Sequence, residues 1–155
     1  KYPGDVLCNA LQIGDKLLAN LGAIDPYIYS FAESLGLKTI HVNQGYTRCA
    51  TAVVSNRAII TMDSVIYAAA QFDALHISEH GILLNGYDYG FIGGCCGLID
   101  RNTLAFTGAL DSLQSGDYIR AFLAKHEVEA VELTQNRMLD IGGILPLKIS
   151  ACDPD

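Results

Sequence analysis

The chain has 155 residues, about the size of one domain, and half of its residues are apolar. Its formal net charge of −7 argues against a nonspecific nucleic-acid binder, because such a protein needs a basic stripe. No apolar run approaches the roughly 18 residues of a membrane span, and residues 1–5 do not resemble a signal peptide, so we expect a cytoplasmic protein without a membrane partner.

Three segments are predicted to form β-hairpins. Each consists of two short apolar runs around a turn that contains Gly, Asp, Asn or Ser, residue types that favour tight turns. The segments are residues 8–21, 49–62 and 95–108, and their turns lie at residues 14–15, 55–57 and 100–102.

A helix is predicted after each hairpin, because a capping residue precedes apolar residues at helical spacing. Asp25 opens the first helix, Asp63 the second, and Ser115 or Asp117 the third. In the first helix the apolar spacing includes Phe31 and Leu35. The other apolar residues at this spacing are Ile28 and Ala32.

A short strand is predicted after each helix, over residues 37–42, 74–78 and 129–133. The order strand, strand, helix, strand therefore occurs three times, in units of about residues 5–48, 49–93 and 94–138, followed by a closing strand over residues 139–150. The fold class is α/β, in one domain over residues 1–155. Since the chain does not begin with Met, we expect it to be a piece of a longer protein.

Equivalent positions of the units are expected to converge if the units surround a common axis. His41, His76 and Glu132 form one such set, since each is the polar residue between two apolar neighbours of a third strand.

Four motifs add to this repeat: Gln44 to Cys49, Ala58 to Thr61, Gly86 to Gly94, and Phe106 to Gly108. They are similar to a bacterial family known only as a domain of unknown function. The strand-strand-helix-strand units also resemble the pentein superfamily, whose propeller holds five modules about a pseudo-fivefold axis. That superfamily includes guanidine-modifying enzymes and a ribosome anti-association factor without catalysis. The resemblance implies an incomplete pentein-like propeller of about three modules, whose open ends favour self-association or a missing upstream segment.

The chain departs from the catalytic penteins in its candidate catalytic residues. Those enzymes combine acidic residues, a histidine motif and a late nucleophilic cysteine in a glycine-rich junction. None of the four histidines here matches that motif, and Cys152 lies in a polar tail. The resemblance therefore brings no activity with it.

The five cysteines include no C-x-x-C pair, so we expect no disulfide framework, no metal and no cofactor. Cys95 is the first candidate nucleophile, because free N–H groups of the preceding Gly93 and Gly94 would stabilise a thiolate. Cys49 is the second, since the positive charge of the preceding residue also favours a thiolate. His80, in a predicted loop, is the candidate base. The alternative interpretation is that the thiols pack in the core.

Asp88 and Asp140 are candidate anchors for a small cationic guanidinium or ammonium group. Tyr87, with Gly93 and Gly94, would form the wall of the pocket, because dense glycines let the backbone approach a ligand closely. The alternative is that the carboxylates cap turns and that the glycine-rich stretch is a tight crossover into the third unit.

Two functions follow from these alternatives. One is a thiol-dependent hydrolase or transferase of a small amidine- or amide-containing substrate. The other is a non-catalytic ligand-binding or assembly module, in which the glycines serve close packing. The superfamily contains both kinds, so the fold alone does not decide between them.

Overall fold

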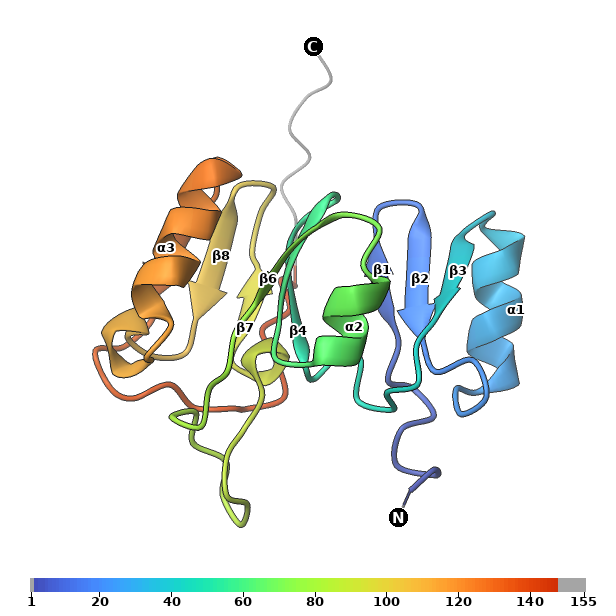
Figure 1. Ribbon diagram of the computed structural model, residues 1–155, viewed down its shortest axis with the longest axis horizontal. Helices are drawn as coiled ribbons and strands as arrows, with labels where there is room; N and C mark the ends of the chain where they lie inside the picture. Colours follow the sequence, from blue (N-terminus) through green and yellow to red (C-terminus); the bar gives the residue numbers. More distant parts are fainter. Residues whose placement is uncertain (1, 148–155) are drawn as a thin grey trace.

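A computed structural model describes residues 2–147 and contains three small three-stranded sheets with helices between their strands (Figure 1). In each sheet the first two strands form an antiparallel hairpin, and the third strand pairs in parallel with the second after a helical connection. The fold is therefore mixed α/β.

The first sheet contains β1 (Leu11–Ile13), β2 (Lys16–Ala19) and β3 (Lys38–His41). The second contains β4 (Thr51–Ser55), β5 (Ala58–Thr61) and β6 (Asp73–His76). The third contains β7 (Cys96–Leu98), β8 (Thr103–Phe106) and β9 (Glu129–Glu132). The connecting α-helices are α1 (Pro26–Ser34), α2 (Ser64–Ala69) and α3 (Gly116–Lys125), and two short 3-10 helices are η1 (Ile92–Gly94) and η2 (Leu110–Ser112).

The predicted order of elements is present in all three units. The reason is local: Asp25 and Asp63 cap α1 and α2 by accepting backbone N–H groups, at 2.8 Å from Tyr27 N and 2.9 Å from Val65 N. Within residues 2–147, however, no strand of one sheet pairs with a strand of another, so the sheets do not close on one another.

The predicted closing strand over residues 139–150 is wrong for residues 139–147. Leu139 forms only a single parallel bridge with Leu83. Gly142 and Gly143 then adopt φ angles of +93° and +123°, which extended strands do not contain. Residues 148–150 lie outside the described residues.

The middle strand of the central sheet, β5, is buried on both faces, because it contributes to two hydrophobic cores. Side chains alternate along a strand, so Ile59 packs with residues of the first unit, including Ile13, whereas Ile60 packs with residues of the third unit, including Phe106. This alternation explains why every residue of β5 is buried. The two cores join the three units.

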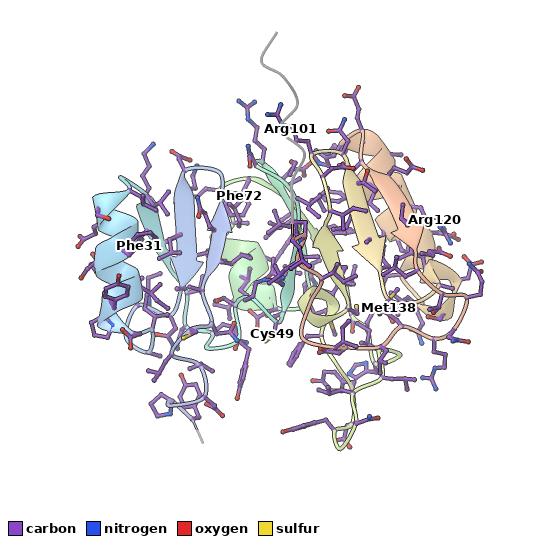
Figure 2. The ribbon with its side chains drawn as sticks, turned by 180° about the vertical axis from the view of Figure 1, so that it is seen from behind. Phe31, Cys49, Phe72, Arg101, Arg120 and Met138 are labelled. Atoms are coloured by element: carbon purple, nitrogen blue, oxygen red, sulfur yellow. The ribbon has the colours of Figure 1, made fainter. Side chains whose placement is uncertain are left out.

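The outer helix α1 packs against one sheet only. Ala32 is its one buried residue, while Phe31 and Leu35, at the same helical spacing, are 55% and 56% exposed. Phe31 lies on the outer surface (Figure 2) and stacks on Tyr27, which is also exposed. Among residues 2–147, no helix has the length and apolar character that crossing a membrane would require.

Polar contacts also join the second and third units. Asp73 Oδ2 of β6 lies 2.5 Å from Lys125 Nζ and 2.8 Å from His126 Nε2, and these two residues lie at the end of α3. The hydrogen bond from Lys125 lowers the pKa of Asp73. At the other end of the same helix, Glu79 Oε1 accepts the backbone N–H of Ser115 at 2.5 Å. The helix α3 is thus held to the second unit at both ends.

We predict that Phe106→Ala lowers the free energy of unfolding by about 3–5 kcal/mol, because Phe106 is completely buried and its removal leaves a cavity in the larger core. The matched control is Phe31→Ala, where the exposed ring should cost less than about 1 kcal/mol. Chemical denaturation of both variants measures the difference. Equal losses would contradict the assignment of this core.

Candidate functional site

Gly93 and Gly94 lie at a tight junction in which η1 contacts the segment before β4. Gly93 N donates to Cys49 O at 2.8 Å, and Arg48 Nη1 donates to Gly93 O at 2.8 Å. A Cβ atom at Gly93 would overlap the carbonyl oxygen of Arg48, and one at Gly94 would overlap the carboxylate of Asp140. These two glycines serve close packing, because neither has free space beside it.

Asp140 fixes the last described segment against this junction. Its Oδ2 accepts the backbone N–H of Phe91 at 2.9 Å, and its Oδ1 accepts that of Gly142 at 3.0 Å. Both oxygens of the predicted substrate anchor therefore bind the protein's own backbone.

Cys95 and Cys96 are buried, and each thiol donates to the carbonyl of Ile92, at 3.2 and 3.1 Å. Burial raises the pKa of Cys95, and it raises the pKa of Cys96 to about 12. Both groups are therefore thiols at neutral pH, which opposes the nucleophilic role considered for Cys95.

Cys49 is different, since it is half-buried and its Sγ accepts a hydrogen bond from Asn9 Nδ2 at 3.1 Å (Figure 2). Asn9 also accepts the backbone N–H of Arg48 at 2.6 Å. Within residues 2–147, no histidine forms a hydrogen bond with a cysteine.

His80, Tyr87 and Asp88 lie in the loop between β6 and η1, which extends from the lower edge of the molecule in Figure 1. Tyr87 is 75% exposed and Asp88 is exposed. His80 is also exposed, and its ring contacts that of Tyr89 edge-on, with 4.9 Å between ring centroids. Tyr87 and Asp88 therefore form no wall around Cys95, and His80 is not paired with that thiol.

A pocket of about 280 Å³ lies beyond the carboxyl ends of β3, β5 and β6. Parallel strands of α/β sheets commonly place ligands in this position. Of the predicted site residues, only His80 lines it. The lining residues are Gln44, Ala50, Met62, Asp63, Ser78, Glu79, His80, Tyr89 and Phe91.

The charged residues of this pocket are two carboxylates. Asp63 Oδ1 caps α2, and Asp63 Oδ2 accepts from Gln44 Nε2 at 2.5 Å. Glu79 is only 2% exposed, and its buried Oε2 has no hydrogen-bond partner among the described residues. Neither Lys nor Arg lines the pocket, so negative charge predominates.

Aromatic rings also line the pocket. Tyr89 and Phe91 meet edge to face, with 6.0 Å between centroids, and Phe91 also stacks on Tyr46 at 6.3 Å. Aromatic faces together with carboxylates are suited to an organic cation, because both attract positive charge while the rings also bury apolar surface.

Gln44 and Glu79 were not among the predicted site residues, although the repeat contains a signal for them. His41 and His76 end the third strands at equivalent positions, since they pair with the last residues of β2 and β5. Gln44 and Glu79 each follow three residues later. The same register therefore predicts two equivalent polar residues beyond the strand ends. Asp63 was predicted as a helix cap, and it is also a wall of the pocket.

The expected convergence of His41, His76 and Glu132 does not occur through mutual contacts. His41 Nδ1 accepts the backbone N–H of Leu21 at 3.2 Å, and Glu132 Oε1 accepts that of Leu110 at 3.1 Å. These side chains thus bind their own units. Within the described part of the chain, no three His, Cys, Asp or Glu side chains group in a way that could hold a metal ion.

Comparison with known proteins gives one match. A family model described as a family of unknown function (DUF6873) matches residues 1–145. No curated protein and no solved structure matches the chain.

We predict that Gly93→Ala destabilises the fold by about 1–3 kcal/mol, because the added methyl group would meet three backbone carbonyl oxygens that cannot rotate away. Gly22→Ala is the control: the nearest atom to its Cβ would be 3.5 Å away, so the change should be within about 0.5 kcal/mol. Thermal and chemical unfolding measure both variants. A Gly93→Ala variant as stable as the control would show that the junction has room for a ligand.

Proposed function

The chain belongs to this family of unknown function, and we propose that it binds a small organic cation without catalysing a reaction. The observation that carries the proposal is the pocket in which Asp63 and Glu79 face aromatic rings and no Lys or Arg. A guanidinium or substituted ammonium ion matches this chemistry, since it carries positive charge on an apolar or planar body.

Glu79 supplies the strongest reason to expect a ligand. A buried carboxylate oxygen without a hydrogen-bond donor costs free energy, and Glu79 Oε2 is such an atom within residues 2–147. A ligand N–H group that reached this oxygen after a shift of the side chains covering it would recover part of that cost. Tyr89 and Phe91 would contact the remainder of the ligand.

The non-catalytic interpretation is favoured by the glycine junction. Gly93 and Gly94 accommodate neighbouring backbone and the carboxylate of Asp140, and Cys95 is a buried thiol. Such an arrangement is what close packing requires, whereas a nucleophile needs access and a favoured thiolate.

The same proposal includes a pentein-like arrangement of the three units. It is supported by the recurrence of a hairpin, a helix and a parallel third strand in each unit. Exposed Tyr27, Phe31 and Leu35 on α1 form an apolar surface that self-association would cover.

We predict that methylguanidinium and tetramethylammonium bind in the pocket and that neutral urea does not. NMR titration of the whole chain measures the affinity. Glu79→Gln and Asp63→Asn keep the size of each side chain and remove its charge, and each should weaken binding by about tenfold.

Asp117→Asn is the matched control, because Asp117 is an exposed carboxylate on α3 outside the pocket. It should leave the affinity unchanged. We call the pocket lined by Asp63 and Glu79 the cation pocket. Its assignment would be rejected if urea bound as tightly as the cations, or if Asp117→Asn weakened cation binding as much as Glu79→Gln does.

A thiol-dependent hydrolase or transferase of a small amidine or amide is the second candidate. It is favoured by Cys49, which is half-buried, follows Arg48 in the chain and accepts a hydrogen bond from Asn9 Nδ2 at 3.1 Å. His80 and Ala50, the residue after Cys49, both line the pocket. In this candidate Cys49 is the nucleophile, and Asp88 or Asp140 would attract the substrate.

Alkylation by a haloacetamide at neutral pH, located by mass spectrometry, tests this second candidate. If Cys49 is a nucleophile, it should react faster than the exposed Cys8, and Asn9→Ala should slow it. Cys95 and Cys96 should stay unlabelled in the folded protein, because burial raises their pKa values. If Cys49 were labelled more slowly than Cys8, the thiol-dependent enzyme would be rejected and the non-catalytic binding module would be the one remaining candidate.

A further inference from the structure

A second, larger concavity lies at the opposite end of the strands from the cation pocket. It has a volume of about 1230 Å³ and is lined by residues at the hairpin ends of the sheets. Those hairpin ends lie at the upper edge of Figure 1. The concavity is lined by the β4–β5 turn and the β7–β8 turn, and by residues 71–73 before and at the start of β6. Lys16 at the start of β2 and His126 after α3 complete the lining of this concavity. We call it the hairpin groove.

The hairpin groove contains three cationic side chains in a chain with a net charge of −7. They are Lys16, which pairs with Asp15 at 2.8 Å, and Arg57 and Arg101. Arg57 and Arg101 are exposed at the turns, and within residues 2–147 neither forms an ion pair. Two guanidinium groups are therefore available to an anion.

The two carboxylates of the groove are already engaged elsewhere. Asp73 lies between Lys125 Nζ and His126 Nε2, so two cationic groups face it. Asp100 accepts the backbone N–H of Asn102 at 2.8 Å, and this hydrogen bond lowers its pKa. Neither carboxylate pairs with Arg57 or Arg101.

Apolar side chains form part of the same lining. Phe72 and Leu98 are half-buried, and Ile99 is 36% exposed. Figure 2 places Phe72 and Arg101 toward this end of the molecule. An aromatic ring and two branched side chains would bury the apolar part of a ligand whose charged part meets the arginines.

We propose that the hairpin groove binds a small organic phosphate, with Arg57 and Arg101 on the phosphate and Phe72 and Ile99 against a planar apolar group. The forked guanidinium matches phosphate oxygens in pairs, which gives both affinity and orientation. The acidic charge of the whole chain disfavours a long polyanion, because such a ligand would extend beyond the cationic residues of this groove. This inference does not depend on the cation pocket.

The test is an NMR titration of the whole chain with AMP, adenosine and inorganic phosphate. AMP should bind most tightly and should shift resonances of the β4–β5 and β7–β8 turns, because it contains both a phosphate and a planar group, whereas adenosine and inorganic phosphate each contain only one of them. Arg57→Gln and Arg101→Gln should each weaken AMP binding by about tenfold. Both residues are in exposed turns, so thermal unfolding of these variants should match that of the unchanged protein.

Arg137→Gln is the control, because Arg137 is exposed and lies outside the groove, where it donates to Gly81 O at 3.2 Å. It should leave AMP binding unchanged. The proposal is overturned if AMP does not bind at millimolar concentration, if the control weakens binding equally, or if inorganic phosphate binds as tightly as AMP. It is also overturned if AMP fails to bind while the two arginine variants dissociate a dimer in sedimentation, since the groove would then join copies of the chain.

Discussion

The arrangement of the molecule depends on the absence of side chains at Gly93 and Gly94. At these positions η1 lies directly against the carbonyl groups before β4 and against the carboxylate of Asp140. Arg48 donates to Gly93 O, and its backbone N–H donates to Asn9, so this junction connects the first unit to η1, which precedes β7 of the third sheet. A methyl group at either glycine would separate surfaces that now touch.

This close junction determines where function can be located. Strand β5 is buried on both faces, because its alternate residues belong to different cores. The two candidate sites described above lie at the two ends of the strands. The carboxyl ends present Asp63, Glu79 and aromatic rings, whereas the hairpin ends present Arg57 and Arg101. The fold thus separates negative and positive sites across the length of the sheets.

The element order was predictable from sequence because its signals are local, such as the caps Asp25 and Asp63 and the turn residues of the hairpins. The candidate site was less predictable because it depends on packing between units. A glycine-rich stretch can surround a ligand or admit a neighbouring backbone, and spacing alone does not distinguish these cases. Glu79 is set in its pocket by Ser115, which is 36 residues away in the chain. The residues next to Glu79 in the sequence do not indicate that contact.

The helix α3 gives the two proposed sites a common support. At its beginning, Ser115 N donates to Glu79 of the cation pocket, and at its end Lys125 and His126 contact Asp73 of the hairpin groove. Between these ends, Ile119 and Leu123 are buried in the larger core. Apolar packing therefore fixes the position of α3. The hydrogen bonds at its two ends hold Glu79 and Asp73 in place relative to the helix. A change that moved α3 would alter the cation pocket and the hairpin groove together. It would do so although none of the hydrogen bonds and ring contacts described above joins a residue of one site to a residue of the other.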